Sequence, residues 1–169
     1  FLRKDLILMS IVQYTIAHTD AQFQVARQLI LQYAQGLDLN LDFQNFDQEM
    51  QHLATEYNRP HGVLLLAHID HHPAGIVALH QFDGPIAEMK RLYVVPAYRH
   101  LGIARELISR LLIQAQHLGY QSVRLDTLPT MTSAQALYHA MGFVPIAAYR
   151  YNPVPGTLYL EHFFNPKTH

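Results

Sequence analysis

One stretch of the sequence combines residue types that suit a bound diphosphate. The apolar run up to Val95 predicts a strand and the pattern after Gly102 predicts a helix, so the loop between them leads into a helix N-terminus. Such a terminus presents unpaired backbone N–H groups and the positive end of the helix dipole. Gly102 allows unusual backbone angles, and Arg99 and Arg105 add positive charge. These features favour a pyrophosphate site, although an ordinary strand-to-helix connection has the same outline.

Several other kinds of site are disfavoured by the sequence. It contains neither the G-x-x-x-x-G-K-S/T loop nor the G-x-G-x-x-G fingerprint of the best-known phosphate sites. The absence of cysteine excludes a disulfide scaffold, a cysteine nucleophile and a cysteine zinc site. His68, His71 and His72 cluster near a predicted turn, where side chains point outward, and we expect no metal cofactor.

The composition is that of a single globular domain. A length of 169 residues, 50% of them hydrophobic and 15% charged, suits one packed core. The formal net charge of −1 gives no reason to expect a nucleic-acid partner, and no apolar run approaches the roughly 18 residues of a membrane span. We therefore expect no nucleic-acid and no membrane partner, and a cytoplasmic location. Residues 1–8 are expected to be vector-derived or upstream sequence, and residues 9–169 to form the domain.

The hydrophobic pattern predicts an α/β (α+β) domain with one mixed sheet, because helical and strand periodicities alternate along the chain. The order is strand–helix–helix, a meander of strands, and then helix–strand–helix–strand–strand. We expect strands at 13–17, 63–69, 75–81, 87–95, 122–126, 144–150 and 158–164, helices at 20–35, 43–57, 103–118 and 133–141, and turns or loops at 36–42, 70–74, 83–85, 98–102, 128–132 and 151–156.

Two motifs in this framework resemble those of one enzyme family. Residues 99–104, Arg-x-x-Gly-x-Ala, match the Gln/Arg-x-x-Gly-x-Gly/Ala signature of the GNAT superfamily of acyl-CoA-dependent N-acetyltransferases. Residues 134–143, Ala-x-x-Leu-Tyr-x-x-x-Gly-Phe, look like the family's second signature. The resemblance covers residues 60–165 well. It implies a single-domain GNAT-like fold with six or seven strands and about four flanking helices. It also implies that two parallel strands, 87–95 and 122–126, splay apart at the cofactor site.

The resemblance implies acetyl-CoA as the co-substrate. The main chain of Leu92, Tyr93 and Val94 would pair with the pantetheine arm, and the opened strands would supply an oxyanion donor. Met131 stands where many family members carry Asn, so a side-chain contact to the cofactor is in question there. The pyrophosphate would be held by Arg99, His100, Leu101, Gly102, Ile103, Ala104 and Arg105.

The implied reaction is attack of an amine on a thioester, which requires a proton to leave the nitrogen. Glu88 is the first candidate base, because it lies 14 residues before Gly102, a spacing similar to that in the histone-modifying branch of the family. A salt-bridged Glu88 is the structural alternative, and Asp126 or an ordered water is the reserve. Tyr138 occupies the family's position for the acid that protonates the departing thiolate. Without cysteine, direct transfer in a ternary complex is the simplest route.

We expect the acceptor to be a small-molecule or amino-acid-like amine. Residues 1–85 carry 4 basic and 9 acidic side chains, a net charge of −5 that would suit a cationic acceptor. The alternatives are a protein lysine or N-terminal acetyltransferase and a non-catalytic acyl-CoA-binding module. A homodimer is possible if the last strand is an exposed edge. Candidates for the acceptor pocket are Tyr33, Tyr149, Tyr151 and Asn152, for which simple loop packing is the alternative.

Overall fold

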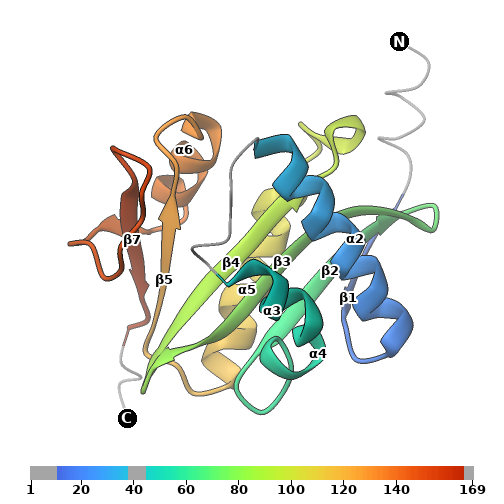
Figure 1. The fold of residues 1–169 in the computed structure, drawn as a ribbon, viewed down its shortest axis with the longest axis horizontal. Helices are drawn as coiled ribbons and strands as arrows, with labels where there is room; N and C mark the ends of the chain where they lie inside the picture. The colour runs from blue at the N-terminus through green and yellow to red at the C-terminus, as the bar shows by residue number, and fades with distance from the viewer. Residues whose placement is uncertain (1–10, 38–44, 166–169) are drawn as a thin grey trace.

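The computed structural model describes residues 11–37 and 45–165, in which one seven-stranded mixed sheet forms the centre of the molecule (Figure 1). The strand order is β1-β2-β3-β4-β5-β7-β6, and β4 and β5 form the parallel pair. This order confirms the expected fold class. The strands are β1 (Val12–Ile16), β2 (Val63–Ile69), β3 (His72–Asp83), β4 (Ile86–Val94), β5 (Ser122–Thr127), β6 (Val144–Pro145) and β7 (Leu158–Phe163).

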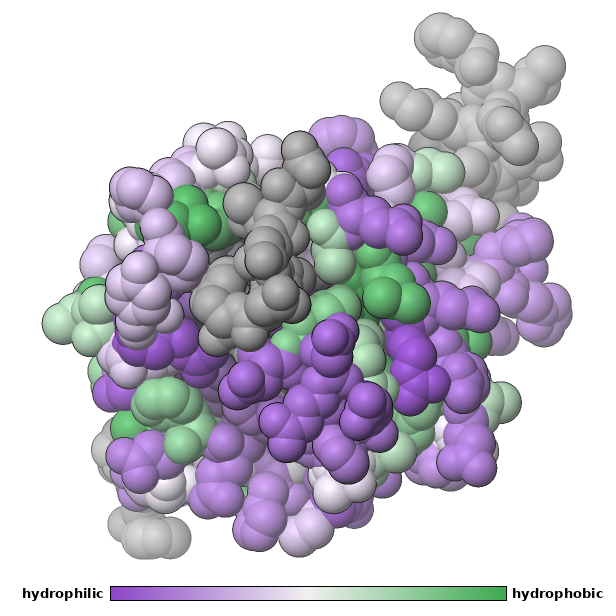
Figure 2. All heavy atoms as spheres, viewed as in Figure 1, coloured by the Kyte–Doolittle hydropathy of each residue, from purple (hydrophilic) through white to green (hydrophobic). Residues whose placement is uncertain are grey.

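Helices cover both faces of this sheet. Figure 1 shows α2, α3 and α4 in front of it and α5 behind it, and each side has its own apolar core cluster. The outer surface of the front layer is mainly hydrophilic (Figure 2), as expected for amphipathic helices that bury one side against a sheet. No helix in the described ranges is both long and apolar enough to cross a membrane. The helices are α2 (Asp20–Leu37), α3 (Phe46–Gln51), α4 (Leu53–Glu56), α5 (Ile103–His117) and α6 (Thr132–Ala140), with a 3-10 turn, η2 (Pro96–Tyr98).

The parallel pair β4 and β5 separates partway along its length. Ile86, Ala87 and Glu88 pair with residues 122–124, and no pairing continues beyond Glu88 although both strands do. This confirms the predicted splay. Main-chain groups on the open side of β4 are therefore free of β5 in the half that precedes the loop at residues 99–102.

A β-bulge in β4 alters which face its side chains occupy. Arg91 has a φ of +63°, and the register with β3 is irregular at this point. Met89 and Leu92 both pack with the core cluster on the α5 side, so Lys90 and Arg91 must both point to the opposite side. Without the extra residue, Arg91 would share the face of Met89. The bulge thus places two consecutive cations on the α2 side of the sheet.

Four of the sequence-based expectations need correction. The helix expected over 43–57 is two short helices, because His52 lies outside the helical region with φ −121°. The strand expected at 144–150 ends at Pro145; Ile146 still donates a hydrogen bond to Tyr159, but Tyr149 and Arg150 contact Glu88 instead of extending the strand. The turn expected at 70–74 is only Asp70–His71, both with positive φ, so β3 starts at His72. The last strand, β7, lies between β5 and β6 and is not the sheet edge, so a dimer through it stays an untested prediction. Residues 1–10 and 38–44 lie outside the described ranges. They include part of the loop predicted at 36–42 and the start of the helix predicted at 43–57.

Candidate active site

The loop between β4 and α5 has the backbone geometry of an anion site. His100 and Gly102 have φ values of +66° and +81°, and α5 begins directly after Gly102. Glycine tolerates such a φ without strain. Among the described residues, no backbone carbonyl accepts a hydrogen bond from the N–H groups of residues 100–105. These donors have no partner among the described residues and lie at or next to the positive end of α5, which fits a pyrophosphate.

A cavity of about 990 Å³ is lined by this loop and by the separated parts of β4 and β5. The C-terminal turns of α2 and the inner side of α6 complete its wall, and Met131 also faces it. The predicted cofactor residues Leu92, Tyr93, Val94, Arg99, His100, Gly102, Ile103, Ala104 and Arg105 all line the cavity. Leu101 instead packs against the α5-side core. The structure thus brings together the two predicted groups, the β4 residues and the loop.

Tyr138 on α6 also lines this cavity, with 7% of its surface exposed. Its ring packs against Phe143, with 5.7 Å between ring centroids. Burial is the main cause that raises the pKa of Tyr138 above its ordinary value, and the charge of Asp126 adds to it. The phenol therefore holds its proton at neutral pH. Tyr138 combines a core ring with a protonated hydroxyl at the cavity, which are the properties that a proton donor to a thiolate needs.

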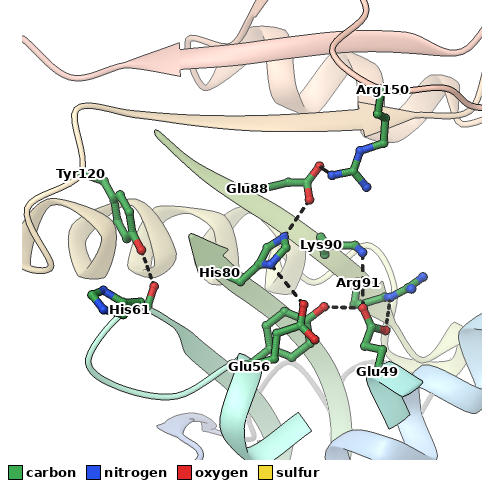
Figure 3. A network of polar contacts seen from close by, with 10 residues as sticks. Glu49, Glu56, His61, His80, Glu88, Lys90, Arg91, Tyr120 and Arg150 are labelled. Atoms are coloured by element: carbon green, nitrogen blue, oxygen red, sulfur yellow. Dashed lines mark hydrogen bonds and ion pairs between the residues drawn. The ribbon is translucent and has the colours of Figure 1, made fainter. Parts of the chain in front are cut away.

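Glu88 lies in a different environment and is buried, with 0% exposure. Figure 3 shows it between His80 and Arg150. Its Oε1 is 2.7 Å from His80 Nε2, and its Oε2 accepts a 2.7 Å hydrogen bond from the Tyr149 hydroxyl and pairs with Arg150. His80 Nδ1 is 3.2 Å from Glu56, so the imidazole bridges two carboxylates. Glu88 is not among the described residues that line the cavity.

These partners determine the charge state of Glu88. Burial by itself would raise its pKa, but the hydrogen bond from His80 and the charges of Arg150 and Lys90 outweigh burial and hold the pKa at about 2. In turn, the two carboxylates raise the pKa of His80 despite its burial. Glu88 is thus a permanently ionised carboxylate with its oxygens occupied, as in the salt-bridged alternative considered from the sequence.

Asp126, at the end of β5, does line the cavity. The Asn152 amide donates a hydrogen bond of 3.3 Å to its Oδ2. Burial is the main cause of the raised pKa of Tyr33, and the negative charge of Asp126 raises it further, as it does for Tyr138. The charge of Asp126 therefore affects one residue of α2, Tyr33, and one residue of α6, Tyr138, both of which line the cavity. Of the two candidate carboxylates, Asp126 is the one that a molecule in the cavity can contact.

The other acceptor-pocket candidates occupy different places. Tyr33 lines the cavity, and its ring lies 5.8 Å from that of Tyr93. Tyr149 belongs to the Glu88 network, Asn152 holds Asp126, and Tyr151 is 80% exposed. No group of three or more potential metal ligands was found in the described ranges, which include the histidines at 68–72.

Sequence reasoning missed a third polar cluster, built on Glu49 of α3 (Figure 3). Glu49 is 4% exposed, and its Oε2 lies 2.9 Å from Arg91 Nε. Its Oε1 lies 3.3 Å from Lys90 Nζ and accepts a hydrogen bond from the Tyr57 hydroxyl. Lys90 and Arg91 both line the cavity. The signal available in the sequence was the pair of consecutive cations, Lys90 and Arg91, in a strand that otherwise carries Glu88 as its one charged residue.

Comparison with known proteins gives the family. Residues 29–143 match the acetyltransferase (GNAT) family. The chain is 40% identical over 137 residues to an uncharacterised N-acetyltransferase of Schizosaccharomyces pombe, covering 80% of this chain and 84% of that protein. It is 30% identical over 154 residues to rat (Rattus norvegicus) N-acetylaspartate synthetase, covering 88% of this chain and 48% of that protein.

A solved structure shares the fold. The PaiA N-acetyltransferase of Thermoplasma acidophilum, crystallised in complex with coenzyme A, superposes with a TM-score of 0.68 at 14% identity, covering 90% of this chain and 99% of that one. The motif match, the splayed strands and these relatives agree with one another. The chain belongs to the GNAT superfamily and is an acyl-CoA-dependent N-acetyltransferase.

Proposed function

We propose that the enzyme transfers an acetyl group from acetyl-CoA to the primary amine of a small, amino-acid-like molecule by direct attack in a ternary complex. One observation carries the proposal. A single cavity joins the loop between β4 and α5 to Asp126 and Tyr138 at the point where β4 and β5 separate. The name of the rat relative, N-acetylaspartate synthetase, supports an amino-acid-like acceptor.

The residues that hold the donor follow from the loop geometry. Backbone N–H groups of residues 100–105, with Arg99 and Arg105, would bind the pyrophosphate, and the unpaired side of Leu92–Val94 would pair with the pantetheine arm. When bound there, acetyl-CoA supplies an activated acetyl group as a thioester. None of these contacts requires the Asn that many family members carry where this chain has Met131.

The remaining chemistry consists of two proton movements. The acceptor nitrogen forms a bond to the acetyl carbon as the carbon–sulfur bond breaks, so one proton must leave the nitrogen and one must reach the sulfur. We assign the first to Asp126, directly or through a water, because it lines the cavity. We assign the second to Tyr138, whose phenol stays protonated.

Glu88 is assigned a positioning role instead of the base role. A carboxylate with a pKa of about 2 is a weak base at neutral pH, and three partners already occupy its oxygens. Its contacts connect β3 and β4 to the segment that carries Tyr149 and Arg150. That segment leads to Asn152, which holds Asp126. Glu88 therefore acts on the cavity through other residues.

The test is release of free CoA thiol from acetyl-CoA in the presence of a panel of primary amines. We expect turnover with at least one small amine. Asp126→Asn is expected to lower kcat by about 10²–10⁴-fold without changing the affinity for acetyl-CoA. Asp20→Asn, an exposed Asp at the start of α2, is the matched control and should behave as wild type.

The other readings predict different results in this assay. Turnover only with peptides or proteins would indicate a protein acetyltransferase. Binding of acetyl-CoA with no thiol release on any amine or peptide would indicate a non-catalytic acyl-CoA-binding module. Wild-type kcat in Asp126→Asn would overturn the role assigned to that carboxylate.

A further inference from the structure

Arg91 has structural features that the proposed reaction does not explain. It is 6% exposed, lines the cavity and adopts a left-handed φ of +63°, which a residue with a Cβ adopts only at some cost. The bulge at this position directs its side chain to the α2 side, beside Lys90. β-Bulges next to active sites commonly redirect one side chain. The strained backbone therefore brings the guanidinium to the α2 side of the sheet, where Arg91 lines the cavity.

Arg91 shares its carboxylate partner with a second cation. Lys90 and Arg91 both pair with Glu49, so two cations share one carboxylate. The Tyr57 hydroxyl also donates to Glu49 and brings no negative charge. Burial alone would lower the pKa of Arg91, but Glu49 outweighs it and raises that pKa, so the guanidinium is charged. The Arg91 guanidinium is thus a charged group whose one carboxylate partner among the described residues is shared with Lys90.

One atom of the guanidinium lacks a partner. Nε of Arg91 donates to Glu49, whereas Nη2 is buried and makes no hydrogen bond within the described part of the chain. A buried charged donor that has lost water without gaining an acceptor is costly, and such atoms are uncommon in folded proteins. An oxyanion supplied by a ligand in the cavity would give the guanidinium a second anionic partner.

The charges of Arg91 and Asp126 both act on Tyr33. Burial is the largest influence on the pKa of Tyr33, followed by the positive charge of Arg91, which lowers it, and the negative charge of Asp126, which raises it. Tyr33 therefore lies within electrostatic range of both groups, and Tyr33, Arg91 and Asp126 all line the same cavity. If the ammonium group of a small molecule lies near Asp126, a second, anionic group of the same molecule can pair with Arg91.

We propose that the acceptor is an aminocarboxylate, such as an α-amino acid, whose carboxylate binds the Arg91 guanidinium while its amine lies at Asp126. The inference rests on the proposed function and specifies its substrate class. A carboxylate fits because guanidinium N–H groups form short, charge-assisted hydrogen bonds with it. Arg91 is then a specificity residue, and Glu49 is the positioning residue that orients it.

The experiment compares matched acceptors in the thiol-release assay. Each free amino acid is assayed beside its carboxamide, which keeps the amine and side chain but removes the negative charge, and beside its aminophosphonate analogue. We expect kcat/KM for the free acid to exceed that for the amide by about 100-fold or more, because the amide leaves the guanidinium unpaired. Equal values for acid and amide would overturn the inference, and so would a preference for the phosphonate. Absence of thiol release with every amine would contradict the proposed function itself.

Variants connect the preference to Arg91. Arg91→Gln is expected to reduce the acid-to-amide ratio to near one, and Arg91→Lys to lower it partly, because a point charge replaces a planar fork. Glu49→Gln leaves the Arg91 charge in place but weakens the contact that orients the guanidinium, so it is expected to reduce the preference less than Arg91→Gln does. Arg91→Gln alone removes the Arg91 partner of the buried Glu49 carboxylate, which can destabilise the fold. The double variant Glu49→Gln/Arg91→Gln removes both charges, and once it folds as wild type it should also lose the preference for the acid. A ratio unchanged in both Arg91→Gln and the double variant would contradict the assignment.

Discussion

Glu88 and Arg91 lie three residues apart on β4, yet they belong to two regions with opposite organisation. Around Glu88 the strands β4 and β5 are still paired, and every partner of the carboxylate comes from the protein. Around Arg91 the strands have separated, a cavity has opened, and one guanidinium nitrogen makes no hydrogen bond within the described residues. The network around Glu88 is closed and stabilises the sheet. The region around Arg91 is open to the cavity, where a substrate could bind.

The comparison teaches that ionisable residues on one strand cannot be ranked as catalytic by their type alone. Glu88 is the more deeply buried carboxylate, and its pKa is strongly shifted. Perturbed pKa values often mark active sites, but they also mark structural ion pairs. The distinguishing property is whether the group can be reached from the cavity, and Asp126 has that property.

The largest effect on stability is expected from Glu88→Gln. The native pKa of Glu88, about 2, lies below its ordinary value of 4.5, so ionisation stabilises the fold by about 3 kcal/mol at neutral pH. This contribution is fully present above about pH 4.5 and is lost as the pH falls through about 2. Wild type should therefore lose stability over that window in urea unfolding, and Glu88→Gln should show a lower free energy of unfolding and a flatter acid limb. An unchanged free energy of unfolding in the variant would break the comparison.

The next effect is expected from Tyr138→Phe in the open region. Removing the hydroxyl keeps the ring in the core and takes away the proton for the departing thiolate. We expect kcat to fall by about 10²-fold, which corresponds to about 2.7 kcal/mol, with the melting temperature nearly unchanged. Steady-state kinetics beside thermal unfolding measures both quantities. Phe143→Leu, a change in the neighbouring buried ring, is the matched control and should lower stability more than kcat.

A smaller effect is expected at the loop. Gly102 has a φ of +81°, and no heavy atom lies within 4 Å of where a Cβ would be, so strain alone opposes a side chain there. Gly102→Ala should cost about 1–2 kcal/mol, seen as weaker acetyl-CoA binding by calorimetry as the loop relaxes. Gly84 also has a positive φ and free space around a Cβ, but it is remote from the loop in sequence. Gly84→Ala should therefore lower the free energy of unfolding without changing the affinity for acetyl-CoA. Equal affinities in wild type and Gly102→Ala would argue against the loop as the pyrophosphate site.

The smallest effect sharpens the description of the closed network. Tyr149→Phe removes one hydrogen bond to Glu88 and leaves the His80 and Arg150 contacts in place. We expect a loss of about 1 kcal/mol in the free energy of unfolding and a small upward shift in the pKa of Glu88. Chemical denaturation and NMR titration of the carboxyl carbon measure these changes. A large loss of kcat at unchanged stability would instead move Tyr149 into the reacting region.

The parts of the fold that depend on local pattern could be predicted from the sequence. The strand–loop–helix at residues 87–117 and the motif residues of α6 follow from hydrophobic spacing and two short motifs, and the structure has them nearly as expected. The prediction of a strand at 144–150 was wrong because the apolar residue pattern does not indicate that Tyr149 and Arg150 contact Glu88. Burial of apolar residues and pairing in a sheet are different outcomes with the same local pattern.

The missed cluster depends on contacts that no local pattern encodes. Glu49 and Arg91 are 42 residues apart, and they meet because a bulge in β4 reverses the face of Arg91. The position of that bulge is set by pairing with β3, which is a tertiary property. The same limit applies to the choice between Glu88 and Asp126, since accessibility from a cavity exists only in the folded chain.

The most direct test of this account measures kcat for Asp126→Asn and Glu88→Gln side by side, with acetyl-CoA affinity and the free energy of unfolding determined for both. We predict that Asp126→Asn loses about 10²–10⁴-fold in kcat while it stays as stable as wild type, and that Glu88→Gln loses mainly stability and keeps most of its kcat at a temperature where it is folded. The opposite pattern, a fully active Asp126→Asn and an inactive but stable Glu88→Gln, would contradict the division between the two regions and return the base role to Glu88.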